Sequence, residues 1–183
     1  MIAHRGNSAN APENTVESLR QGVALGADAL EFDVRLTRDG HAVVIHDATV
    51  ERTTDGVGAV ASFTLADLQR LDAGFSFSSD GGRAYPWRGC GITIPSLEQV
   101  LVTFPLTPFI VEIKTPAASS EARGLPERHG TAGRCIVGAF SAEALVPFRG
   151  TAFARSASNA DAVRLYARAA LPFGPRTLPY RAL

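Results

Sequence analysis

A chain of 183 residues is long enough to form one domain with a sizeable hydrophobic core. Its 18 basic and 18 acidic residues balance, so the composition gives no indication of a broad field that would draw the protein to nucleic acid or to an anionic membrane. The most apolar stretch, residues 100–113, is interrupted by Pro105 and Pro108 and is too short to cross a membrane. We therefore expect a globular protein with neither an integral membrane segment nor a nucleic-acid partner.

The N-terminus and the cysteines bear on cellular location. Met1 leads directly into strand-like sequence, without the charged and apolar regions that make up a signal peptide. Cys90 and Cys135 are isolated from each other and lack the spacing of metal ligands. Two unpaired thiols in the cytoplasm are the interpretation that we favour, and a secreted chain with one disulfide bond stays open.

The chain begins with a short strand that ends at His4 and continues into a polar loop. Asn14 has the character of a helix N-cap, and Glu17 three residues later completes a capping box. Gly26 ends this predicted helix. The apolar and acidic residues that follow alternate over residues 29–34, which predicts a strand.

A further strand is predicted over residues 42–46. Only about seven residues join it to the preceding strand, fewer than a crossover helix needs. The two strands are therefore either a hairpin that turns at residues 39–40, or parallel strands joined by an extended loop. In both arrangements His46 lies near the carboxylate-bearing end of the preceding strand.

The composition of the sequence changes over residues 47–95, where Gly, Ser, Thr and aromatic residues dominate. One short helix is predicted there, capped by Thr64 with Asp67 at its third position. So many loop-rich residues in a compact domain are typical of a functional insertion rather than of a linker. We assign residues 48–94 to an inserted subdomain within a single domain that covers residues 1–183.

Regular alternation of helices and strands resumes at Ser96, which is predicted to cap a helix. The later predicted elements are strands at 109–113, 135–140 and 151–154 and helices over 142–146 and 158–170. Strands separated by helices imply parallel βα units and an α/β fold. The segment 115–134 should hold a crossover helix, but its prolines and glycines predict a helix that is short or broken.

Two of these strands carry acidic residues on one face. Side chains in a strand alternate with period two, so Glu31 and Asp33 share a face, and Glu112 shares one with Lys114. Clustered carboxylates repel one another unless a cation lies between them, and Mg²⁺ or Ca²⁺ takes oxygen ligands of this kind. Either strand taken alone is also explained as a half-exposed antiparallel strand with a polar outer face.

Two histidines and two cationic side chains complete the candidate site. His4 and His46 each end a predicted strand, and parallel neighbouring strands would bring both imidazoles to the rim where α/β barrels build their active sites. Imidazoles suit a general acid and base, and Arg5 and Lys114 suit an anion such as phosphate. Taken singly, each histidine is more often a packing residue. Together with the carboxylates, these residues are the parts that metal-assisted phosphodiester cleavage needs.

Several short motifs occur in a fixed order along the chain. They are AHRG at 3–6, PENT at 12–15, EFDV at 31–34, TRDG at 37–40, VVIHD at 43–47, IPSLE at 94–98 and EIK at 112–114. With these motifs the sequence resembles the glycerophosphodiester phosphodiesterase family, densely over residues 1–116 and more weakly beyond.

The resemblance implies a TIM-type (β/α)8 barrel with a small inserted subdomain. It implies one divalent cation, Mg²⁺ or Ca²⁺, held by Glu31, Asp33 and Glu112. The reaction that it implies is hydrolysis of a small glycerophosphodiester to glycerol 3-phosphate and an alcohol.

The resemblance also implies roles for the remaining site residues. His4 and His46 would be the acid–base pair, and Arg5 and Lys114 would contact the phosphate. Which histidine is the acid, and whether water or a substrate hydroxyl attacks, stay open at this point.

The predicted strands are too few to close such a barrel. Six are convincing, and we expect the sequence to lack the last two βα units and to belong to a longer protein. We also expect a short excision between Thr115 and Arg134.

Two other functions stay open. An enzyme of the lysophospholipase D or sphingomyelinase D kind would use the same site on larger lipids, with an apolar entrance. Aromatic residues of the insertion would line it: Phe63, Phe75, Phe77, Tyr85 and Trp87. A non-catalytic anion-binding barrel is the third reading, and the presence of both histidines argues against it.

Overall fold

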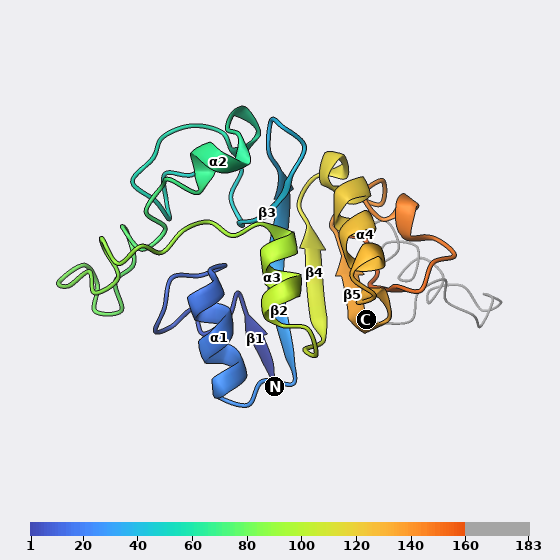
Figure 1. The fold of residues 1–183 in the computed structure, drawn as a ribbon, viewed down its shortest axis with the longest axis horizontal. Coiled ribbons are helices and arrows are strands. Elements are labelled where there is room, and N and C mark those ends of the chain that lie inside the picture. Colours follow the sequence, from blue (N-terminus) through green and yellow to red (C-terminus); the bar gives the residue numbers. More distant parts are fainter. Residues whose placement is uncertain (160–183) are drawn as a thin grey trace, which may run out of the picture.

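The computed structural model describes residues 1–159, and its centre is a sheet of five parallel strands (Figure 1). In spatial order they are β1 (Ile2–His4), β2 (Ala29–Leu36), β4 (Phe109–Ile113), β5 (Cys135–Gly138) and β6 (Ala154–Arg155). Helical segments connect β1 to β2 and β4 to β5, as βα units require. The α/β class and the TIM-type succession of parallel strands are confirmed.

The sixth strand, β3 (Ala42–Val44), runs antiparallel to β2. β2 extends beyond its pairing with β1, which ends at Glu31, and its C-terminal part pairs with β3 from Val34 to Leu36. Of the two arrangements left open by the sequence, the hairpin is the one that forms. The hairpin returns the chain toward the sheet, where the amide of Ile45 donates to the carbonyl of Asp33 at 3.0 Å.

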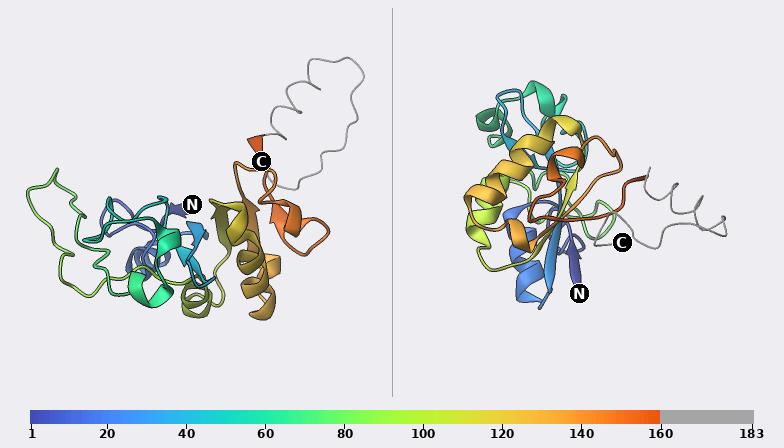
Figure 2. Two further views of the ribbon diagram at one scale, coloured as in Figure 1. Left: turned by 90° about the horizontal axis from the view of Figure 1, so that it is seen from above. Right: turned by 90° about the vertical axis from the view of Figure 1, so that its right-hand side faces the viewer.

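The helices α1 (Val16–Ala24), α3 (Leu97–Thr103) and α4 (Ser119–Arg128) lie along one face of the sheet (Figures 1 and 2). That face carries alternate, fully buried apolar residues, and the rings of Phe32 and Phe109 meet edge to face at 5.6 Å between centroids. Together they form the main core. The opposite face of β2 and β4 therefore carries the intervening residues, among them Glu31, Asp33 and Glu112. None of the helices within residues 1–159 is long and apolar enough to span a bilayer.

The start of α1 differs from the prediction. Thr15, not Asn14, is the N-cap, and its hydroxyl accepts a hydrogen bond from the amide of Ser18. Asn14 instead has a φ of 59°, in the left-handed region that asparagine tolerates better than most residues. The predicted end of the helix is confirmed, since Gly26 follows the C-cap with a φ of 83°.

Residues 48–94, termed the inserted segment below, contain η1 (Val60–Ser62) and α2 (Leu65–Leu68). The predicted capping box of Thr64 and Asp67 is confirmed. The segment packs in a second, small core together with two residues that precede it: Val43, Ile45, Val50, Val60, Leu68, Ala73 and Ile94. β3 is shared between the two cores, because Ala42 and Val44 belong to the main core and Val43 and Ile45 to the small one.

The crossover segment 115–134 forms η2 (Pro116–Ala118), then α4, then η3 (Ala132–Arg134). The helix is continuous over ten residues although Pro126 lies inside it, so the expectation of a short or broken helix is wrong. Pro126 lies near the C-terminal end of α4 and is buried with Ala122 and Leu125. Tertiary packing of this face outweighs the low helix propensity of proline.

The C-terminal elements are shorter than predicted. In place of the helix expected over residues 142–146 there is a single 3₁₀ turn, η4 (Val146–Phe148). The strand expected at 151–154 is the shorter β6, which covers Ala154–Arg155. β5 ends at Gly138, two residues earlier than predicted. The helix predicted over 158–170 lies almost entirely outside the described residues.

Candidate active site

The acidic residues of β2 and β4 converge on the face of the sheet that the helices leave open. The strands are parallel neighbours, and the register pairs Asp33 with Glu112, while Glu31 lies two residues earlier on the same face of β2. Each of the three carboxylates has an oxygen within 4.8 Å of the others. The side chain of Asp33 is only 1% exposed, and those of Glu31 and Glu112 are 13% and 25% exposed. The three residues predicted as cation ligands are thus brought together.

The electrostatics of this cluster favour a bound cation. Burial, together with the negative charge of Asp33, raises the pKa of Glu31 to about 7. Lys114 Nζ lies 2.8 Å from Glu112 Oε1 and 3.0 Å from Asp33 Oδ1, and Arg5 Nε lies 3.1 Å from Asp33 Oδ2. Asp33 Oδ1 is buried and accepts no aligned hydrogen bond. Three converging carboxylates, one of which has a buried oxygen without an aligned hydrogen bond, fit a hard divalent cation.

Asn14 is a site residue that the sequence analysis missed. Its Nδ2 donates to Asp33 Oδ2 at 2.9 Å, and its Oδ1 accepts from the Asp33 amide at 3.3 Å. The left-handed backbone of Asn14 turns the side chain toward β2 rather than toward the amides of α1. The signal available in the sequence was its residue type, since asparagine favours both helix caps and left-handed turns.

The turn after β1 places Arg5 against the acidic cluster. Arg5 has a φ of 56°, and its amide donates to Glu31 at both the carbonyl oxygen, at 2.9 Å, and Oε2, at 3.1 Å. Gly6 follows with a φ of 84°, and a Cβ there would lie 2.4 Å from the backbone carbon of Ser18. The turn is therefore pressed against α1, and only glycine fits its second position. Backbone strain of this kind is typical of functional sites.

The two predicted catalytic histidines reach the same end of the sheet from different strands. His4 ends β1, and its Nε2 lies 3.8 Å from Glu31 Oε2, with the side chain two-thirds exposed. His46 follows β3, and its Nδ1 lies 2.6 Å from Asp47 Oδ1. The carbonyl of His46 also accepts from Arg35 Nε at 2.8 Å. Both imidazoles are accessible, as proton transfer to a ligand requires.

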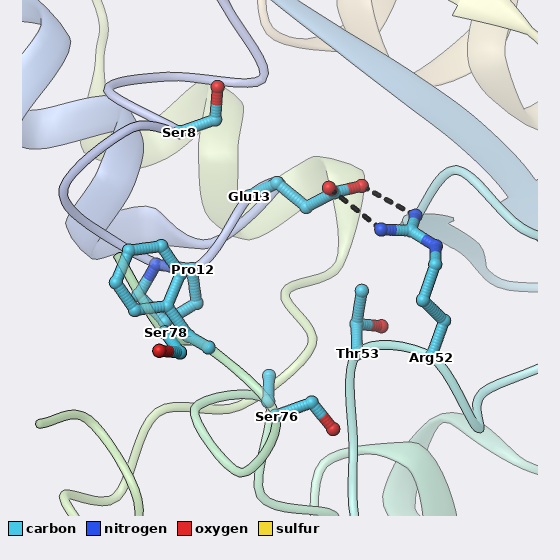
Figure 3. A pocket seen from close by; sticks show the side chains of 9 residues that line it. Ser8, Pro12, Glu13, Arg52, Thr53, Ser76 and Ser78 are labelled. Atoms are coloured by element: carbon cyan, nitrogen blue, oxygen red, sulfur yellow. Dashed lines mark hydrogen bonds and ion pairs between the residues drawn. The ribbon is translucent and has the colours of Figure 1, made fainter. Parts of the chain in front are cut away.

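One cavity adjoins the acidic cluster, and a second lies beside Glu13, the partner of Arg5. The first, of about 240 Å³, is lined by Glu31 and Glu112 together with Ile110, Gly138 and Phe140. The other, of about 310 Å³, lies between the loop after β1 and the inserted segment, and Figure 3 shows its lining. Its walls are mainly hydroxyl-bearing and charged side chains: Ser8, Glu13, Arg52, Thr53, Ser76 and Ser78. Both are large enough for small polar groups.

Comparison with known proteins gives a consistent family. The family model described as "Glycerophosphoryl diester phosphodiesterase family" matches residues 4–137. A glycerophosphodiester phosphodiesterase of Caldanaerobacter subterraneus is 42% identical over 128 residues, which are 70% of this chain and 49% of that protein. The chain therefore spans about half the length of this relative.

Solved structures give the same picture. The glycerophosphoryl diester phosphodiesterase domain of an uncharacterised Mycobacterium tuberculosis protein matches with a TM-score of 0.84 and 28% identity, over 96% of this chain and 66% of that one. An Oleispira antarctica phosphodiesterase, solved in complex with the product sn-glycerol-3-phosphate, matches with a TM-score of 0.72 and 31% identity, over 84% of this chain and 63% of that one.

Proposed function

The chain belongs to the glycerophosphoryl diester phosphodiesterase family, and we propose that it hydrolyses small glycerophosphodiesters to glycerol 3-phosphate and an alcohol. The observation that carries the proposal is the convergence of Glu31, Asp33 and Glu112, within 4.8 Å of one another, beside the cations Arg5 and Lys114. Acidic and basic groups so close together suit a cation and a phosphate held side by side.

We propose that the three carboxylates hold one divalent cation, Mg²⁺ or Ca²⁺. Asp33 Oδ1, which is buried without an aligned hydrogen bond and lies 3.0 Å from Lys114 Nζ, supports this assignment because the oxygen already faces a positive charge. Such a cation supplies a Lewis acid for a phosphoryl oxygen. Lys114 and Arg5, which already neutralise part of the acidic charge, would then be free to bind the phosphate oxygens, with Arg5 capable of a bidentate contact.

His4 and His46 are proposed as the acid–base pair. One imidazole accepts the proton of the attacking hydroxyl, and the other donates a proton to the leaving alcohol oxygen, so that the overall reaction consumes one water. The contact of His46 Nδ1 with Asp47 would leave Nε2 as the atom that exchanges the proton with the substrate. Water can attack the phosphorus directly; if the glycerol hydroxyl attacks instead, the alcohol leaves as a cyclic phosphate forms, and the one water is consumed in a second step that opens this ring.

We infer that residues 1–183 belong to a single domain in which the inserted segment selects the alcohol. Six of the nine residues that line the cavity beside the segment are polar, and the other three are Pro12, Ala73 and Phe77; the polar residues support a small polar alcohol rather than an acyl chain. Of the aromatic residues expected to line an apolar entrance, Phe77 does line this cavity, whereas Phe75 and Tyr85 contact the guanidinium of Arg88, at 4.2 and 4.0 Å from their ring centroids. Phe63 packs against the small core.

A cytoplasmic location is proposed from the two free thiols, Cys90 and Cys135. The partner proposed for the protein is its small-molecule substrate.

The direct test is turnover of glycerophosphocholine with Mg²⁺ or Ca²⁺, measured as glycerol 3-phosphate released. We expect EDTA to abolish turnover and Glu31→Gln to reduce it by orders of magnitude. Glu17→Gln is the matched control, because Glu17 bonds only Arg20 and Gln21 of its own helix among the described residues. Full activity in chelator would refute the metal assignment.

The histidines and the substrate class are tested in the same assay. Replacing His4 or His46 by Ala should each cost about 10²–10⁴-fold in rate, and the wild-type profile should be bell-shaped in pH. Near-normal turnover by His46→Ala would overturn its role. Turnover of lysophosphatidylcholine alone would indicate a lipid-directed enzyme, and anion binding without any turnover would indicate a binding module.

A further inference from the structure

Arg52, in the inserted segment, bonds two carboxylates that come from different parts of the chain. Its Nη1 and Nη2 donate to Glu13 Oε2 and Oε1 at 2.9 and 2.8 Å, the bidentate pair drawn in Figure 3. Its Nε donates to Asp47 Oδ2. Glu13 belongs to the loop between β1 and α1, and Asp47 follows β3, so one guanidinium joins these two loops through the inserted segment.

Each carboxylate continues to a residue of the candidate active site. Asp47 Oδ1 lies 2.6 Å from His46 Nδ1, and Glu13 Oε1 accepts from Arg5 Nη1 at 3.0 Å. Arg5 in turn pairs with Asp33. Arg52 is therefore one side chain removed from both a proposed acid–base group and a proposed phosphate contact.

The geometry distinguishes this contact from an ordinary surface ion pair. Isolated exposed pairs contribute little, and the Arg52 side chain is 48% exposed. Its two carboxylate partners, however, are only 20% and 30% exposed, and all three guanidinium nitrogens are used. The hydrogen bond from Arg52 lowers the pKa of Asp47 to about 2, which keeps this carboxylate ionised beside His46. A planar guanidinium group that donates to two carboxylates at once fixes the orientation of one carboxylate relative to the other.

We propose that Arg52 is a positioning residue, which orients His46 through Asp47 and Arg5 through Glu13 and so makes catalysis depend on the inserted segment. This inference rests on the proposed function of the same site. Lysine cannot replace arginine here, because an ammonium has the charge but not the fork that spans both carboxylates.

The kinetic test compares Arg52→Gln and Arg52→Lys with the wild-type full chain on glycerophosphocholine. We expect both variants to lose about 10- to 100-fold in kcat with KM little changed, the usual range for groups that orient catalytic residues. In Arg52→Ala, added guanidinium should restore part of kcat. Arg70→Gln is the control, since Arg70 is an exposed arginine of the same segment that pairs with Asp67. Wild-type kcat in Arg52→Gln, or full rescue by lysine, would overturn the proposal.

A second measurement does not require turnover. The chain has four histidines, so the ring nitrogens of His46 can be assigned by NMR with a His46→Ala variant. We expect Arg52→Gln to shift the His46 nitrogens while leaving those of His41 and His129 unchanged, with the melting temperature near that of Arg70→Gln. Unchanged His46 signals would overturn the proposal. If the wild type hydrolyses no glycerophosphodiester but these signals shift, the proposed function fails and the positioning contact stands.

Discussion

Asn14 and Asp33 are joined by two hydrogen bonds, one from the asparagine amide to Asp33 Oδ2 at 2.9 Å and one from the Asp33 backbone amide to Asn14 Oδ1 at 3.3 Å. The pair links the loop before α1 to the most deeply buried carboxylate of the acidic cluster. One of the two Asp33 oxygens is thereby fixed, and the other is left facing the cluster.

Removing the Asn14 side chain should weaken cation binding. Asn14→Gly keeps the left-handed backbone accessible while deleting both hydrogen bonds, so calorimetric titration with Ca²⁺ or Mg²⁺ should show an affinity about 10- to 100-fold lower. Asn14→Ala should lower it similarly and also unfold more readily, because alanine at positive φ costs roughly 1–2 kcal/mol. Unchanged affinity in Asn14→Gly would contradict the role assigned to this residue.

The raised pKa of Glu31 predicts that both the cation affinity and the stability of the protein depend on pH. Its pKa in the metal-free protein is raised to about 7, so below that pH a proton must leave before a cation binds. Affinity should therefore fall as pH drops from 7 to 5.5, and calorimetry in buffers of different ionisation enthalpy should detect the released proton.

The same group should destabilise the metal-free fold at neutral pH. Because the folded pKa lies above the ordinary value of 4.5, the contribution of Glu31 to stability is present below pH 4.5 and is lost as pH rises through 7. In chelator at pH 7.5, Glu31→Gln should therefore melt at a higher temperature than wild type, although it binds no metal. A lower melting temperature would show that the carboxylate is compensated within the fold.

Gly6 and Gly40 offer a matched pair for the tight turn after β1. Both have a φ of 84°, but a Cβ at Gly6 would meet the Ser18 backbone at 2.4 Å, and one at Gly40 would meet nothing within 4 Å. Gly40→Ala should lower the free energy of unfolding by roughly 1–2 kcal/mol. Gly6→Ala should cost a further 1–3 kcal/mol or so from overpacking. Equal losses in urea unfolding would mean that the turn can move away from α1.

The two cysteines should differ in reactivity. Cys90 is exposed, whereas Cys135 is buried and its pKa is raised to about 11 by burial. Ellman's reagent at pH 8 should modify Cys90 in the native protein and Cys135 only after denaturation, and Cys90→Ser should abolish the native reaction. Rapid native modification of Cys135 would show that the strand β5 opens.

The acidic cluster was predictable because it follows from two regular features of β-sheets. Alternation along a strand places Glu31 and Asp33 on one face, and parallel pairing in register adds Glu112 beside Asp33. The direction of β3 was not predictable, since its short connection to β2 fits either a hairpin or an extended return.

The polar contacts around the cluster escaped prediction for a different reason. Asn14 has a residue type that suits two local conformations, and only packing against β2 selects the left-handed one. Arg52 bonds Glu13, a residue 39 positions away, through a side chain at the surface. Contacts of this kind produce no repeating pattern in the sequence from which they could be predicted. Helix α4 is the opposite case. The low helix propensity of Pro126 can be read from the sequence, but burial of Pro126 in the folded chain outweighs it.

Alternate residues of β3 belong to different cores, with Val43 and Ile45 in the small core and Ala42 and Val44 in the main one. A local opening that separates the two cores must pull β3 away from one of them, and an opening that takes β3 from the main core displaces His46 as well. Glu31 and Glu112 lie on strands that only the main core supports. We therefore expect mild denaturant to abolish turnover by displacing His46 at concentrations where Glu31 and Glu112 still bind a cation. Amide exchange in the inserted segment should then report the loss of activity before global unfolding does.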